Sequence, residues 1–252
     1  MQTWTRAVDQ RTVTLVGVSH LAEAGYYRAV LELIRALQAG GALVHHERVA
    51  VAGAEERAAC TELERGALDV LDYTMSLVAR IGHATGLMSQ KDGVPAGEDW
   101  VNTDTTEVTL VRLLGPRRIV DALSDKRLPA VVDLLAGHRL GRAGLRWLMR
   151  NLGRLQRFSV LAGDGAVAGL DNRVVVDWRN AFAVTAALAA PAGSHVVAVW
   201  GALHLPGIGD SLQDNDFVLG EVSWYTAIAP RWTLRRRGEL AAGGIVDLEG
   251  GS

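Results

Sequence analysis

Two short segments, far apart along the chain, end in the same Gly-x-x-His pattern. TVTLVGVSH closes with Gly17 and His20, and HVVAVWGALH closes with Gly201 and His204. Each histidine follows an apolar run rich in β-branched residues, which is typical of a buried strand. Imidazole changes its protonation near neutral pH and binds transition metals readily. If the two strands are neighbours, both imidazoles meet in the crevice beyond the carboxyl ends of the strands, where open α/β sheets bind ligands.

A carboxylate follows a third strand-like run, ALVHHERVAV. Strand alternation sends His45 and Glu47 to one side of this strand and His46 to the other. Two imidazoles and a carboxylate are a common ligand set for divalent transition metals. We therefore expect His20, Glu47 and His204 either to hold a divalent metal (Mn, Co or Zn) or to share protons without one. A metal would activate a bound water, whereas without it a histidine paired with Glu47 would act as a general base.

The elements that must position these residues alternate between strand and helix. An opening strand–helix–strand unit predicts a parallel pair of strands, and a helical insertion is expected over about residues 54–160. The pattern predicts an α/β fold with a central, largely parallel sheet flanked by helices. The predicted strands span residues 12–18, 42–51, 173–177 and 196–200, with an edge strand or hairpin within 221–237.

The composition is that of a globular protein with balanced charge. Residues 1–252 carry a formal net charge of −2, and 49% of them are hydrophobic, which suits one domain of this length. The charge balance gives no support to a nucleic-acid or membrane partner. Cys60 is the only cysteine, and the N-terminal residues lack an apolar signal core. We expect a single-domain cytoplasmic protein that acts on a small molecule or peptide, with its oligomeric state left open.

The motifs resemble those of the TraB/PrgY family within the TIKI superfamily, which also takes in the erythromycin-esterase-like and ChaN-like proteins. GVSH and GALHLPGI match the two Gly-x-x-His motifs, VHHER supplies the acidic residue, and DWRN matches an Arg-containing strand-to-helix segment. VNTDTTEVTLVRLL resembles a segment in which an aspartate precedes a Thr-Leu-x-Arg run. The resemblance implies a site that also includes Asp104, Arg112, Arg179 and Asn180.

By this resemblance the chain is a hydrolase-like enzyme that acts on a carbonyl of a peptide, ester or lactone, with or without a metal. Arg179 would stabilise an oxyanion or clamp a carboxylate, while Asp104 reads equally well as a helix N-cap. Two alternatives stay open. One is a lyase or cyclase with the same acid/base residues, and the other is a non-catalytic peptide- or haem-binding module, which is favoured because this chain has Trp178 where the family carries a glutamate. The expected catalytic residues are His20, Glu47, Arg179 and His204, and the expected substrate-binding residues are Asp104, Arg112 and Asn180.

Overall fold

A six-stranded sheet forms the centre of the computed structural model, which describes residues 1–123, 127–162 and 172–228, and the side chains of 1–121, 130–151 and 176–228. Its strands are β1 (Gln2–Arg6), β2 (Arg11–Val18), β4 (Leu43–His46), β6 (Val101–Asn102), β7 (His195–Gly201) and β8 (Phe217–Val222). They lie in the order β6-β4-β7-β2-β1-β8. The first four of these run parallel, whereas β1 is antiparallel to both β2 and β8. The predicted α/β class and largely parallel sheet are confirmed.

β7 lies in the middle of the sheet, between β2 and β4, and pairs with both. Every residue from position 196 to 201 is buried, and the register pairs Gly17 with Trp200 and Val18 with Gly201. The two Gly-x-x-His segments therefore end neighbouring strands at the same edge, as predicted. The predicted pairing of the first two strands with each other is wrong, because β7 separates β2 from β4 and bonds to both.

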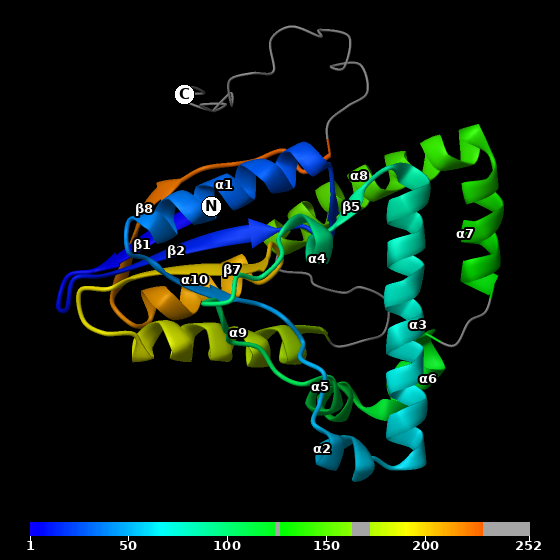
Figure 1. Ribbon diagram of the computed structural model, residues 1–252, viewed down its shortest axis with the longest axis horizontal. Helices are drawn as coiled ribbons and strands as arrows, with labels where there is room; N and C mark the ends of the chain where they lie inside the picture. The colour runs from blue at the N-terminus through cyan, green and yellow to red at the C-terminus, as the bar shows by residue number, and fades with distance from the viewer. Residues whose placement is uncertain (124–126, 163–171, 229–252) are drawn as a thin grey trace, which may run out of the picture.

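Helices cover both faces of the sheet, as Figure 1 shows. On one face lies α1 (Ala24–Ala39), and on the other lie α9 (Asn172–Ala189) and α10 (Leu205–Gln213). Because side chains alternate along a strand, β7 contributes to two separate apolar cores. Val199 packs in the core beneath α1, and Trp200 packs in the core beneath α9 and α10.

The region predicted as a helical insertion consists mainly of helices, several of which stand to one side of the sheet in Figure 1. Two short strands interrupt it: β5 (Met88–Ser89) pairs with β3 (Leu21–Ala22), and β6 joins the main sheet. Residues 124–126 lie outside the described part, and the single-domain organisation stays a prediction. In the ranges that the structure describes, no helix is long and apolar enough to cross a membrane. The helices here are α2 (Ala54–Ala58), α3 (Glu62–Thr85), α4 (Gln90–Gly93), α5 (Glu107–Leu114), α6 (Pro116–Leu123), α7 (Arg127–Gly137) and α8 (Arg139–Ala162).

The strand predicted at residues 173–177 is wrong, because this stretch forms the first turns of α9. Its β-branched residues favour a strand locally. However, β7 already has β4 and β2 as hydrogen-bonded neighbours, and the segment instead covers a face of the sheet. Arg179 and Asn180 consequently come from within a helix rather than from a strand end. An edge strand is present, but it is β8 at Phe217–Val222, which overlaps the predicted range of 221–237 only at its last two residues. Residues 223–228 form no strand, and residues 229–252 lie outside the described part.

Candidate active site

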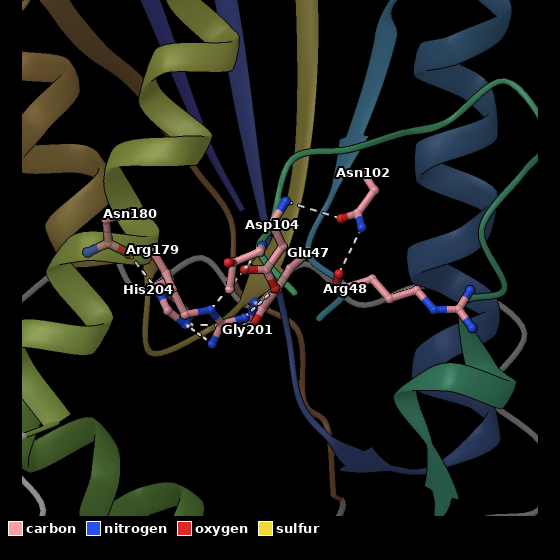
Figure 2. Close-up of polar contacts among 9 residues, drawn as sticks. Glu47, Arg48, Asn102, Asp104, Arg179, Asn180, Gly201 and His204 are labelled. Carbon is pink, nitrogen blue, oxygen red and sulfur yellow. Dashed lines mark hydrogen bonds and ion pairs between the residues drawn. The ribbon is translucent and has the colours of Figure 1, made fainter. Parts of the chain in front are cut away.

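Five polar side chains meet beyond the carboxyl ends of β4 and β7, and Figure 2 shows them converging. They come from four separate parts of the chain: the residue after β4, the loop after β6, the middle of α9 and the turn after β7. We call Glu47, Asp104, Arg179, Asn180 and His204 the polar cluster. Three of the four expected catalytic residues and two of the three expected substrate-binding residues are thus brought together.

Arg179 occupies the centre of the polar cluster. Its Nη2 donates to Glu47 Oε1 at 2.5 Å and to Asp104 Oδ2 at 2.6 Å, and its Nε donates to Asp104 Oδ1 at 3.0 Å. The three side chains are only 13%, 7% and 0% exposed for Arg179, Glu47 and Asp104. Burial opposes the positive charge, but the hydrogen bonds and charges of the two carboxylates outweigh it and raise the pKa of Arg179. The guanidinium is therefore a fixed positive charge held between two negative ones.

Glu47 is anchored on both of its carboxylate oxygens. Oε1 accepts from Arg179, and Oε2 accepts from the backbone N–H of Gly201. Burial alone would raise the pKa of Glu47, but the positive charge of Arg179 and the Gly201 hydrogen bond contribute to an overall lowering. A Cβ at position 201 would lie 3.0 Å from Glu47 Oε2. The glycine of the second Gly-x-x-His motif thus lets the carboxylate approach the backbone.

His204 lies between Asn180 and Arg179. Its Nδ1 is 2.7 Å from Asn180 Oδ1, and its Nε2 is 3.4 Å from Arg179 Nη1 and 3.6 Å from Glu47 Oε1. The ring stands edge-on to Trp200, with the two centroids 5.2 Å apart. Burial lowers the pKa of His204 despite the nearby Glu47. His204 is therefore a neutral imidazole near pH 7, next to an ionised carboxylate.

His20 lies outside the hydrogen bonds of the polar cluster. It is exposed at the end of β2, although it is near enough for its charge to act on Glu47 and His204. The glycine of its motif has a packing role: a Cβ on Gly17 would lie 2.8 Å from the side chain of Leu205. The two Gly-x-x-His motifs thus use their glycines for different close approaches.

Asp104 and Arg112 differ in where the structure places them. Asp104 belongs to the polar cluster, and Thr106 rather than Asp104 caps α5 through a hydrogen bond to the N–H of Thr109. Arg112 points elsewhere: its Nε donates to Glu64 Oε1 on α3 at 2.7 Å. Its guanidinium is thus engaged in a partly exposed ion pair between two helices of the insertion.

The predicted metal ligands do not form a metal-binding group. Within the residues that the structure describes, no three or more His, Cys, Asp or Glu side chains are placed to hold an ion. Both oxygens of Glu47 are taken by Arg179 and Gly201, and the guanidinium of Arg179 faces His204 Nε2. In this arrangement Arg179, rather than a metal ion, supplies the positive charge between Glu47 and His204.

Two features of the site were not expected from the sequence. Asn102 ties the chain after β4 to the loop that carries Asp104: its Nδ2 donates to Arg48 O at 2.8 Å, and its Oδ1 accepts from Asp104 N at 3.1 Å (Figure 2). Gly207 lies against Asn180, whose Nδ2 would be 2.3 Å from a Cβ at that position. The spacing Gly-x-x-His-x-x-Gly was the signal for the second feature, whereas Asn102 gave none.

The resemblance stated above stays a prediction after comparison with known proteins. No family model, curated protein or solved structure matches the chain.

Proposed function

We propose that the chain is a hydrolase-like enzyme in which His204 is the general base that activates water against a carbonyl of a peptide, ester or lactone. The observation that carries the proposal is a neutral, buried His204 beside an ionised Glu47 at the carboxyl ends of two parallel strands. A base must be unprotonated before it can take a proton, and the imidazolium that forms needs a negative neighbour. Glu47 Oε1, 3.6 Å from Nε2, supplies that charge.

The proton acceptor is Nε2 of His204. Its contact with Arg179 Nη1 is long, at 3.4 Å, and a long hydrogen bond is weak. A water molecule can replace that contact and donate its own proton to Nε2. The water oxygen then attacks the carbonyl carbon, and the proton later passes from the imidazolium to the leaving group.

Arg179 can donate a hydrogen bond to the carbonyl oxygen as negative charge develops there, but most of its N–H groups are already engaged. A guanidinium has five N–H groups, and the contacts to Asp104, Glu47 and His204 engage four of them. Among these described contacts, one N–H of Nη1 remains to donate to an oxyanion, and the second becomes available when water replaces the contact with His204. The two carboxylates hold that nitrogen in place, which favours a preorganised donor over a mobile clamp.

His20 has a separate role in the proposed mechanism. It is exposed at the carboxyl end of β2, beside the polar cluster but outside its hydrogen bonds. An imidazole in that position can contact the substrate without disturbing the buried residues. We therefore expect His20→Ala to reduce turnover less than His204→Ala.

The test is turnover of a panel of aryl esters, lactones and short peptides by His204→Ala and Glu47→Gln, with and without added divalent metal. Loss of the general base should lower kcat by about 100- to 10,000-fold. His195→Ala is the matched control, because His195 begins the same strand and contacts Thr14 Oγ1 at 2.9 Å, at the opposite edge of the sheet. Full activity in folded His204→Ala would sink the proposal.

A binding module is the second candidate, and the paired state of Arg179 favours it. A guanidinium already neutralised by two carboxylates has less capacity to stabilise new charge than a free one. This candidate predicts that the wild type turns over no member of the panel, while one member raises the unfolding midpoint of the wild type but not of His20→Ala.

A further inference from the structure

The amide of Asn180 is buried against His204 and does not reach the solvent. Asn180 is 2% exposed, and its Oδ1 lies 2.7 Å from His204 Nδ1. A residue at this depth cannot bind a substrate directly, although the family resemblance predicts that role. It can act only through the imidazole that it contacts.

The proton of His204 can be assigned from its two hydrogen-bond partners. Arg179 Nη1 can only donate, and it points its N–H at His204 Nε2. Nε2 must therefore accept, which leaves the proton of the neutral ring on Nδ1. Nδ1 in turn donates to Asn180, and the acceptor there must be the amide oxygen.

The reversed amide would not fit this site. It would present its NH2 group to Nδ1 and move the ring proton to Nε2, where it would face a second N–H donor from Arg179. The observed orientation has its own penalty, because Asn180 Nδ2 is buried without a hydrogen-bond partner among the described residues. An unmet buried donor of this kind is unfavourable. The site tolerates this penalty in order to turn the amide oxygen toward the histidine.

Gly207 makes the position of Asn180 available. It lies in the first turn of α10, three residues after His204, and a Cβ there would be 2.3 Å from Asn180 Nδ2 and 3.5 Å from its Cγ. Any larger residue at position 207 must displace the amide. The two glycines that flank His204 therefore admit one polar partner each, Glu47 beside Gly201 and Asn180 beside Gly207.

We infer that Asn180 is the positioning residue that fixes His204 in its Nδ1–H tautomer, and that Gly207 is required because it admits the Asn180 amide. The inference rests on the proposed function for its catalytic consequence, since a histidine with its proton on Nε2 cannot take one there. The tautomer itself is a property of the protein alone, and it can be measured in a protein that has no activity.

The experiment is ¹⁵N NMR of the ring nitrogens of His204 at about pH 8, where a histidine of ordinary pKa is neutral. The wild type should show a protonated Nδ1 and a bare Nε2. Asn180→Leu, which removes the acceptor but keeps the same branched arrangement of side-chain heavy atoms, should shift the ring toward the Nε2–H form. Asn180→Asp should keep the Nδ1–H form, because a carboxylate oxygen still accepts there. Gly207→Ala should resemble Asn180→Leu, and Asp210→Ala is the control, since Asp210 is exposed on the same helix.

Two results would overturn the inference: an Nε2–H ring in the wild type, or an Nδ1–H ring that persists in folded Asn180→Leu and Gly207→Ala. Circular dichroism establishes that each variant is folded before its tautomer is assigned. If the wild type hydrolyses a substrate, Asn180→Leu should lose about 100- to 10,000-fold in kcat, and Asn180→Asp should recover much of it. A wild type with no turnover but with the expected tautomers refutes the proposed function and leaves the assignment of Asn180 standing.

Discussion

Replacing Arg179 by methionine tests whether the polar cluster is a buried, charge-balanced unit. Methionine keeps much of the side-chain volume but removes the positive charge that pairs with both Glu47 and Asp104, whose side chains are 7% and 0% exposed. Removing one partner of a buried ion pair costs about 3–5 kcal/mol, because the remaining charge stays desolvated. For a chain of this size each kcal/mol corresponds to about 2–4 °C, so the unfolding midpoint should fall on the order of 10 °C.

Thermal unfolding followed by circular dichroism measures the fall in temperature midpoint. Urea unfolding followed by tryptophan fluorescence and circular dichroism measures the loss of free energy of unfolding. A fall in the midpoint concentration at an unchanged slope reports a change in stability alone. The difference in free energy of unfolding between Arg179→Met and wild type should narrow at about pH 4. Without Arg179, burial raises the pKa of Glu47, and protonating Glu47 removes an unpaired buried charge.

Arg80→Met is the matched control for this measurement. Arg80 pairs with Asp133 at 3.2 Å, but the two side chains are 44% and 56% exposed, and such a pair contributes at most about 1 kcal/mol. If Arg179→Met loses no more than Arg80→Met, then the charges of the polar cluster are solvated and the reasoning from burial fails.

Three further predictions concern pH, packing and metal. Burial lowers the pKa of His204 below its ordinary value of 6.5, so the unfolded chain binds that proton at a higher pH than the folded one. The free energy of unfolding should then fall as the pH drops from about 7.5 to about 5.5, with a smaller fall in His204→Gln. Gly201→Ala should lose about 1–3 kcal/mol in urea unfolding, because its Cβ would press on Glu47 Oε2 at 3.0 Å. Gly25→Ala, with nothing within 4 Å of the new methyl group, should be neutral or gain up to about 1 kcal/mol; equal losses in both would contradict the close approach. Dialysis against EDTA should move the midpoint by less than about 1 °C, since Arg179 fills the place of a cation, whereas a clear fall on dialysis that added zinc or manganese reverses would show a bound ion.

The strands that carry the two Gly-x-x-His motifs were predictable because their signal is local. An apolar, β-branched run that stops at a glycine has few other folded solutions, and both runs are buried in adjacent strands. Glu47 was predictable for a related reason, since alternation along the strand predicted at residues 42–51 puts it on the side of His45. The observed strand is shorter, because β4 ends at His46 and Glu47 is the residue after it. The presence of His204 and Glu47 in one site therefore followed from periodicity and the general rule for parallel sheets.

The order of the strands and the origin of Arg179 were not predictable in this way. The local pattern contains no information on which distant strand lies between β2 and β4. From the strand–helix–strand pattern alone, β2 and β4 are therefore expected to be direct neighbours. The run of valines ahead of Asp177 favours a strand by propensity, yet it forms the start of α9. The hydrogen bonds of Asp104 and Asn180 depend on the order of the strands and on the position of α9 against the sheet. Their partners could therefore not be predicted from local pattern.

The central place of β7 has a consequence for how the chain folds. Thr12 pairs with His195, and Val18 pairs with Gly201, so the middle of the sheet joins residues from opposite ends of the sequence. Contacts between such distant residues close large loops and slow the search for the native state. During synthesis β2 and β4 have no strand between them until the ribosome has released residues beyond position 201, and the polar cluster lacks its histidine until the same moment. Until β7 is available, β2 and β4 must therefore stay without their shared neighbour and in need of protection from aggregation.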